Sequence, residues 1–275
     1  MIRKDLLKII ACPICNSSDL KLNSEKIRCL NCQKIFEVKD NIPIMMEKFL
    51  RVFAGAENRK LKIESNLLLK RLKPPSPSLN LSNKIKNLLD ENKMILDLGS
   101  GERRLAKSVI NLDIFPNPNV DIVGNADTLP FKDGVFDVVI CQAVLEHVGN
   151  PKKVAGEIYR VLKKDGLIYA EIPFLQGFHP DPADYQRYTI QGIEHLFADF
   201  KKIESGVAVG PSSTLSWFLR KYPSLFFNNK HLSRGMEFIF GWITFPIKYL
   251  DYFLLKTKRQ KIAYLAGGFF FLGKK

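Results

Sequence analysis

The sequence predicts an α/β protein, in which helices cover both faces of a mostly parallel β-sheet and a small cysteine-rich module precedes it. From residue 93 onward, short apolar runs alternate with helical patterns, and such alternation is typical of parallel strands joined by helices. The module is indicated by four of the five cysteines, which fall within residues 12–32. A chain of 275 residues with 46% apolar residues can bury such a core, which excludes a disordered protein.

The charge of the chain is unevenly distributed. Residues 1–92 carry a net charge of +8 and residues 201–275 one of +10, whereas residues 93–200 carry −4. Basic flanks favour an anionic partner, either a nucleic acid or a membrane surface, without choosing between them.

No membrane-spanning helix is expected. The most apolar stretch, residues 238–247, has 10 residues, where a span needs about 20. Charged residues also interrupt the short apolar run before Cys12 that would otherwise imitate a secretion signal. We therefore expect a cytoplasmic protein, with peripheral membrane contact left open.

The four clustered cysteines form two pairs, Cys12 with Cys15 and Cys29 with Cys32. Two residues between the members of each pair let one tight turn aim both sulfurs at a single ion, so that two turns complete a four-cysteine zinc site. A redox pair would come singly in a βαβ context, and structural disulfides would need an oxidising compartment. A site with four protein ligands has no open position, so we expect structural zinc that folds residues 1–46.

Residues 1–46 as a whole, through the trailing DNIPIMM, resemble the small zinc-binding activators of tRNA, rRNA and release-factor methyltransferases. The resemblance implies a module that docks onto a catalytic domain. Residues 47–92 are then a helical linker, in which prolines 74, 75 and 77 end a first helix and residues 83–89 form a second.

The strands of the sheet are expected at residues 94–98, 109–114, 120–123, 136–141 and 167–172, with a helix over 151–163. In parallel sheets, ligands bind beyond the carboxyl ends of the strands.

A set of glycines and carboxylates stands at these strand ends. Gly99 and Gly101 follow the first strand and allow close approach of the backbone to a ligand. The third glycine of the dinucleotide fingerprint is absent, as is a P-loop lysine. Asp97 stands before the glycine turn, Asp113 ends the second strand and Asp127 follows the third. They suit S-adenosylmethionine, through its ammonium group, its ribose hydroxyls and its adenine amine respectively.

Four stretches, ILDLGSG (95–101), NLDIF (111–115), residues 125–148 and residues 157–173, resemble class I S-adenosylmethionine-dependent methyltransferases of the type 11 group, which includes quinone-biosynthesis enzymes. The resemblance implies a Rossmann-like seven-stranded sheet over residues 93–275. It also implies the cofactor contacts Asp97, Gly99, Gly101, Asp113, Asp127 and Gln142. Only 11 residues separate Gly101 from Asp113, so the first helix must be very short.

The loop after the fifth strand, residues 174–188, is long and aromatic and is the candidate substrate lid. His179 could act as a general base, with Asp184 beside it. Alternatively, both residues hold the loop closed by hydrogen bonds. Glu146 and His147, on a helix after the fourth strand, are expected to have a structural role.

A class I sheet ends in an antiparallel pair of strands, expected at residues 202–209 and 263–272, which leaves a helical insertion at about 210–262. This insertion combines tryptophan and phenylalanine with basic residues. It could cap the active site, or it could rest on anionic lipid.

The function expected from these observations is methyl transfer from S-adenosylmethionine to an unidentified small-molecule, lipid-linked or glycan-linked acceptor. An RNA or translation-apparatus methyltransferase is one alternative, although the loop after the fourth strand lacks an Asn-Pro-Pro-Tyr-like motif. A non-catalytic zinc-ribbon binding protein is the other, and the intact trio of carboxylates argues against it.

Overall fold

The computed structural model describes residues 3–23, 25–46, 73–79, 84–180, 182–257 and 260–275. Most of the predicted linker, including the helix expected before residue 74, lies outside these residues. The short helix expected near residues 83–89 is α5 (Lys84–Leu88).

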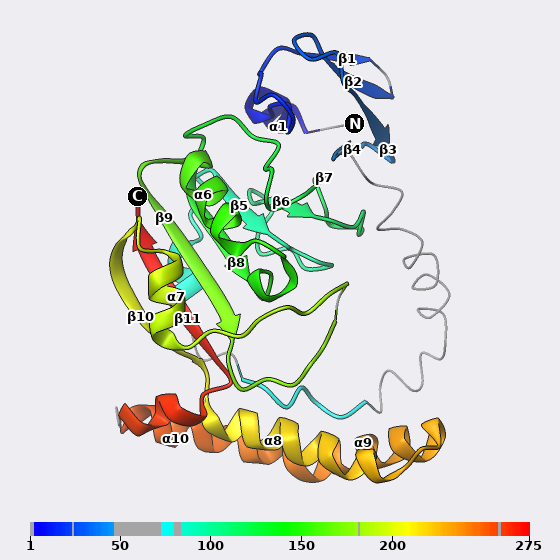
Figure 1. The fold of residues 1–275 in the computed structure, drawn as a ribbon, viewed down its shortest axis with the longest axis vertical. Coiled ribbons are helices and arrows are strands. Elements are labelled where there is room, and N and C mark those ends of the chain that lie inside the picture. The colour runs from blue at the N-terminus through cyan, green and yellow to red at the C-terminus, as the bar shows by residue number, and fades with distance from the viewer. Residues whose placement is uncertain (1–2, 24, 47–72, 80–83, 181, 258–259) are drawn as a thin grey trace.

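The sheet of the larger part has the seven strands that the sequence predicts. They are β5 (Ile95–Leu98), β6 (Ile110–Asp113), β7 (Ile122–Gly124), β8 (Phe136–Gln142), β9 (Leu162–Pro173), β10 (Lys201–Val209) and β11 (Gly268–Lys274), in the order β7-β6-β5-β8-β9-β11-β10. The first five are parallel, and β11 runs antiparallel between β9 and β10. The Rossmann-like methyltransferase fold is confirmed (Figure 1).

Two apolar clusters form the core of the sheet. The larger includes the buried face of α6 (Pro151–Val161), Ile193 of α7 (Ile190–Leu196) and Leu145 of the short helix η1 (Leu145–His147), whereas the smaller packs Leu88 of α5 beneath the sheet. Helix α6 ends two residues earlier than predicted, because the backbone of Leu162 is extended and β9 begins there. Asp165, inside this strand, has a positive φ of 65°.

The first helix of the fold is missing. Residues 99–109, all of them described, form turns and bends, where the sequence predicted a very short helix. Hydrogen bonds and an ion pair made by side chains hold this segment in place instead. Arg104 donates to the carbonyls of Val109 (3.0 Å) and Asn119 (2.6 Å) and pairs with Asp121 at 2.9 Å. Arg104 thus satisfies the carbonyl at the end of the segment and ties the segment to the loop before β7.

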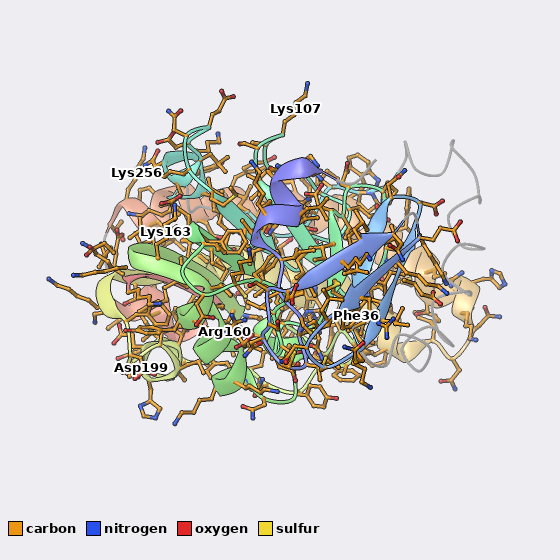
Figure 2. The ribbon with its side chains drawn as sticks, turned by 90° about the horizontal axis from the view of Figure 1, so that it is seen from above. Phe36, Lys107, Arg160, Lys163, Asp199 and Lys256 are labelled. Atoms are coloured by element: carbon orange, nitrogen blue, oxygen red, sulfur yellow. The ribbon has the colours of Figure 1, made fainter. Side chains whose placement is uncertain are left out.

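The cysteine-rich module consists of α1 (Lys4–Ile9) and the strands β1 (Leu20–Asn23), β2 (Lys26–Cys29), β3 (Ile35–Lys39) and β4 (Ile42–Met45). These strands form an antiparallel meander. Its last strand, β4, pairs in parallel with β7, which makes one sheet of eleven strands. Viewed from the end that carries the module, the meander lies in front of the larger sheet (Figure 2). The module is therefore an extension of the sheet.

The segment between β10 and β11 is helical and lies in a layer across one end of the molecule (Figure 1). Its elements are α8 (Pro211–Lys221), η2 (Tyr222–Phe226), α9 (Lys230–Thr244), η3 (Phe245–Tyr249), α10 (Leu250–Lys256) and η4 (Gln260–Leu265). We call residues 211–265 the helical layer. Helix α8 packs along α9 and η3, so the layer is a hairpin of helices.

The helical layer is polar inside and apolar outside. Along α9, η3 and α10, the buried residues are Gly241, Thr244, Lys248 and Asp251, at helical spacing along one face. Those of α8 are Ser212, Ser213, Thr214 and Ser216. Of the 26 exposed large apolar side chains in the described chain, 18 lie in this layer, among them Leu225, Phe226, Ile243 and Phe253. This is the reverse of the pattern in a water-soluble helix pair.

One helical run in the described chain could cross a membrane by length and composition. Lys230–Lys256 has 27 residues, and its most apolar 18-residue window has a mean hydropathy of 1.2 and is 22% buried. The expectation that no segment qualifies is therefore wrong on these two criteria. It counted only the uninterrupted apolar stretch, whereas the helical backbone continues through η3 and includes scattered polar residues.

Asp251 caps α8 from the other arm of the hairpin. Its carboxylate accepts hydrogen bonds from the backbone N–H groups of Ser212 and Ser213, both at 2.8 Å, and from the Ser213 hydroxyl at 2.7 Å. The residue before α8 is Gly210, which offers no side-chain cap. A Cβ at this glycine would come within 2.3 Å of the Asp251 carboxyl carbon, so the missing side chain makes room for the cap.

Replacing Asp251 with alanine should lower the free energy of unfolding by about 2 kcal/mol, because two buried helix N–H groups lose their acceptor. Both tryptophans, Trp217 and Trp242, lie in the layer, so urea denaturation followed by tryptophan fluorescence measures the effect. Asp251→Asn, which keeps one acceptor oxygen, should lose less. Equal stability of Asp251→Ala and the unmodified chain would contradict this account of the cap.

Candidate functional site

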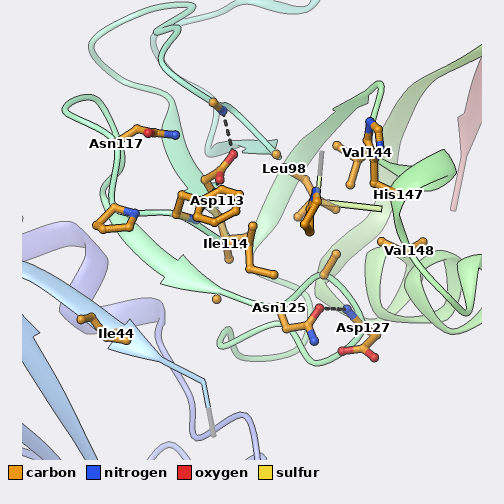
Figure 3. A pocket seen from close by; sticks show the side chains of 18 of the residues that line it. Ile44, Leu98, Asp113, Ile114, Asn117, Asn125, Asp127, Val144, His147 and Val148 are labelled. Atoms are coloured by element: carbon orange, nitrogen blue, oxygen red, sulfur yellow. Dashed lines mark hydrogen bonds between the residues drawn. The ribbon is translucent and has the colours of Figure 1, made fainter. Parts of the chain in front are cut away.

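A cavity of about 1020 Å³ opens at the carboxyl ends of β5, β6 and β7. The glycine turn after β5 forms one wall, and the end of β6 and the loop after β7 form the next (Figure 3). Residues of the β3–β4 hairpin of the module close it on one side, and Pro182 and Tyr185 of the loop after β9 lie on the other. The site is thus built from three separate parts of the chain.

The glycine turn depends on two left-handed residues, Gly99 (φ 71°) and Gly101 (φ 57°). A Cβ at Gly99 would lie 2.2 Å from Cγ2 of Val144, so only glycine allows the loop after β8 to pack there. No atom lies within 4 Å of a Cβ position at Gly101, where the backbone borders the cavity. The turn therefore presents bare backbone to a ligand.

Asp113, at the end of β6, is held in position by backbone hydrogen bonds. One carboxylate oxygen accepts from the N–H of Gly101 at 2.8 Å and the other from the N–H of Phe115 at 2.9 Å (Figure 3). Each oxygen retains a second lone pair for a ligand. Asp127 borders the same cavity beyond β7, and Lys153 lies 3.9 Å from its carboxylate.

Asp97 lies outside the cavity lining and is fully buried. Arg103 binds its carboxylate through Nε at 3.0 Å and Nη2 at 2.7 Å, and also donates to Gln142 Oε1 at 2.6 Å. Burial raises the pKa of Asp97, and the arginine opposes this rise. A guanidinium thus stands beside Asp97, where the sequence predicted a cofactor ammonium, and the cofactor roles of Asp97 and Gln142 remain predictions.

The four clustered cysteines converge. Sγ of Cys12 lies 3.6 Å from Sγ of Cys32, and Sγ of Cys15 lies 3.6 Å from Sγ of Cys29; all four sulfurs lie within 4.8 Å of one another. Tetrahedral zinc with Zn–S bonds of about 2.3 Å separates its sulfurs by about 3.8 Å. The donor set and its spacing therefore fit zinc. Cys141 is apart from them, buried in β8, and its burial raises the pKa of the thiol.

The loop over residues 174–188 is organised around Asp184. Its carboxylate accepts from both terminal nitrogens of Arg187 and, at 2.8 Å, from the backbone N–H of His179. The arginine holds the pKa of Asp184 well below its ordinary value. These hydrogen bonds close the loop on itself, as in the alternative expectation that His179 and Asp184 hold the loop closed. The catalytic roles of His179 and Asp184 remain predictions.

Other residues of the site are not evident from the sequence. Ile42 and Ile44 of the module border the cavity, as does Ala143, whose φ of 53° is unusual for a residue with a side chain. Glu146 is fully buried within 4 Å of His147 and His179, and burial raises its pKa to about 7. The positive φ and the hairpin contact arise from tertiary packing and have no local sequence signal.

Comparison with known proteins identifies both parts. Residues 89–170 match the methyltransferase domain model Methyltransf_11. A demethylmenaquinone methyltransferase of Renibacterium salmoninarum is 37% identical over 78 residues, which are 28% of this chain and 32% of that protein. A UPF0434 protein of Nitrosococcus oceani is 39% identical over 55 residues, which are 20% of this chain and 93% of that protein.

Among solved structures, the complex between the Haloferax volcanii Trm112 methyltransferase activator and a methyltransferase matches with a TM-score of 0.43 and 17% identity, over 83% of this chain and 98% of that one. Apart from the UPF0434 proteins, the chain spans 17–39% of the length of the curated relatives that it matches. The chain belongs to the UPF0434 family through its N-terminal module, and the domain that follows matches the methyltransferase domain model over residues 89–170.

Proposed function

We propose that the chain transfers a methyl group from S-adenosylmethionine to an acceptor bound in the cavity at the carboxyl edge of the sheet. The observation that carries the proposal is the joint placement of Asp113 and the glycine turn at one wall of this cavity. A positioned carboxylate beside bare backbone fits the ribose and the neighbouring polar groups of that cofactor, and Asp127 lies further along the same wall.

When bound, the cofactor supplies an electrophilic methyl group on a sulfonium. The chain's contribution is mainly alignment, since a displacement at this carbon is accelerated chiefly by holding the two reactants in line. Asp113 fixes the ribose end, and Tyr185 and Pro182 close the cavity over the acceptor side. Asp184, ionised and bound by Arg187, is proposed as a positioning residue of this loop.

Asp113→Ala should weaken S-adenosylmethionine binding at least tenfold, because hydrogen bonds to a charged group contribute about 1.5–3 kcal/mol. Calorimetric titration of the full, zinc-replete chain measures this affinity. Asp133→Ala is the matched control, because Asp133 is an exposed carboxylate outside the cavity. Absence of binding to the folded unmodified chain would overturn the proposed activity.

We further propose that the acceptor is amphiphilic and that the enzyme is cytoplasmic and bound peripherally to a membrane. The support is the helical layer. Its buried residues are small or polar and bond to one another, as when Ser216 Oγ donates to the carbonyl of Thr244 at 2.9 Å. Small residues and interhelical hydrogen bonds are typical of helix pairs in lipid, where apolar side chains face outward.

The charges of the layer favour anionic lipid. Residues 211–265 contain nine Lys or Arg and two Asp or Glu. Exposed Trp242, Tyr249 and Tyr252 stand among the apolar side chains, and such residues are favoured at the headgroup boundary.

One side of the layer packs against the rest of the chain, which favours a position in the plane of the membrane. Lys248 Nζ donates to the carbonyl of Ser76 at 2.7 Å, and the N–H of Leu79 donates to Ser213 Oγ at 3.1 Å. A helix that is covered along one side by the protein cannot be surrounded by lipid, so the opposite, apolar side is the one that enters the bilayer.

The layer also contacts the substrate loop. A Cβ at Gly177 would come within 1.9 Å of the Trp217 ring, so the tryptophan lies directly on this residue of the loop. An acceptor that is anchored in the membrane would therefore meet the same loop that borders the cavity through Pro182 and Tyr185. This proximity supports a lipid-linked acceptor.

The full chain should float with vesicles of phosphatidylcholine and phosphatidylglycerol at 3:1, and brominated lipid should quench its tryptophans. Replacing the exposed Ile243 and Phe253 with glutamate should weaken binding to the vesicles at least tenfold, because burial of each apolar side chain in lipid contributes about 1.5–3 kcal/mol to the binding free energy. Ile35→Glu, at an exposed apolar position of the module, is the control. Failure to float, or salt-dependent RNA binding in its place, would overturn the membrane proposal.

The cysteine cluster is proposed to hold one structural zinc ion. Cys32→Ser should lower the zinc content by one equivalent per chain, measured by elemental analysis, and should lower the melting temperature, since metal binding folds such modules. Cys141→Ala is the control, because Cys141 lies outside the cluster. Unchanged zinc content in Cys32→Ser would contradict the assignment.

A further inference from the structure

We propose that Glu146, His147 and His179 form a second metal site, for a divalent transition metal, at the edge of the cavity. The inference rests on the proposed function only for what the metal does there. The three side chains come from two places in the chain, η1 and the loop after β9. The structure brings one ligand atom of each within 4.8 Å of the others.

The geometry centres on the Glu146 carboxylate. Its Oε1 lies 3.8 Å from Nε2 of His147 and 3.9 Å from Nε2 of His179. The two imidazole rings are perpendicular, with centroids 5.3 Å apart. Both Nε2 atoms thus face the same carboxylate oxygen at separations too long for direct hydrogen bonds. Three atoms that each lie about 2.1 Å from one ion are at most about 3.6 Å apart, so these side chains would have to draw together by a few tenths of an ångström or more around a metal ion.

Backbone carbonyls set the tautomer of both histidines. Nδ1 of His147 bonds to the carbonyl of Ala183, and Nδ1 of His179 bonds to the carbonyl of Gly177 at 2.8 Å. A carbonyl only accepts, so each Nδ1 carries the hydrogen and each Nε2 keeps its lone pair when the ring is neutral. Metal-binding histidines are typically oriented in this way by a second hydrogen bond. Arg187, 3.3 Å from Nδ1 of His179, is the weaker contact there.

Glu146 provides the independent observation. Its side chain is fully buried, and neither carboxylate oxygen has a hydrogen-bond partner in the part of the chain that the structure describes. A buried polar group without a partner destabilises the fold, and more so when it is charged. A metal ion between the carboxylate and the two imidazoles would remove that destabilisation, which makes the cluster more than a chance grouping of side chains.

The ligand set indicates the class of ion. Two imidazoles and a carboxylate suit zinc and related transition metals, whereas magnesium and calcium prefer oxygen ligands alone. Three protein ligands leave a position open. Since His147 borders the cavity, an oxygen of the acceptor could take the open position. A hydroxyl bound there would lose its proton more readily, since the metal stabilises the anion.

For the test, the full chain is first loaded with one equivalent of zinc, which fills the cysteine cluster, and excess zinc is removed. Zn²⁺ is then titrated into this protein by calorimetry. A further equivalent should bind, and Glu146→Gln and His179→Asn should each weaken it at least tenfold. Both are near-isosteric, and thermal melting verifies that the variants fold. His195→Asn is the matched control, because His195 is an exposed histidine on α7 outside the cluster.

Binding of only one equivalent in total, or binding by Glu146→Gln as tight as that of the unmodified chain, would overturn the site. The titration contains no S-adenosylmethionine. A chain that binds the second metal ion without binding the cofactor would therefore refute the methyltransferase proposal alone, and the reverse result would refute only the metal site.

Discussion

The parallel pairing of β4 with β7 is the contact on which the arrangement of the cavity depends. Strand β7 has three residues, and without β4 it would be a short exposed edge. The register Ile44 to Val123 joins the module to the sheet and brings the β3–β4 hairpin over the cavity. The cysteines belong to the same module, two before β1 and two at the connection of β2 to β3, so the order of the module and the shape of the cavity are physically linked.

Much of the fold is local in the sequence, and that part was predictable. Apolar strands, turn glycines and carboxylates at strand ends are each encoded within a few residues. Gly99, Gly101, Asp113 and Asp127, which were read from such local patterns, border the cavity, and their cofactor roles remain predictions. The missing first helix was not predictable, because the carbonyls of Lys107, Ser108 and Val109 accept hydrogen bonds from Arg3, which lies far away in the sequence.

The remaining features of the site arise only when distant segments meet. Arg103 beside Asp97, the module hairpin over the cavity, and the approach of His179 to Glu146 join positions that no local pattern relates. The helical layer is a related case. Its amphipathic pattern was visible in the composition, but which side is buried follows from packing, in particular from Asp251, which bonds to the start of α8 and draws the polar faces together.

The position of the helical layer imposes a constraint on the substrate loop. Trp217 rests on Gly177, and the carbonyl of the same glycine accepts from His179 and from Arg187, at 2.8 Å and 3.0 Å. A displacement of the layer would therefore be transmitted to the histidine and to the arginine that binds Asp184. Since a few tenths of an ångström matter for the alignment of reacting groups, attachment of the layer to a surface would fix the loop as well as bring the enzyme to its acceptor. Under the membrane proposal, the helical layer and the loop beside the cavity would act through this one contact.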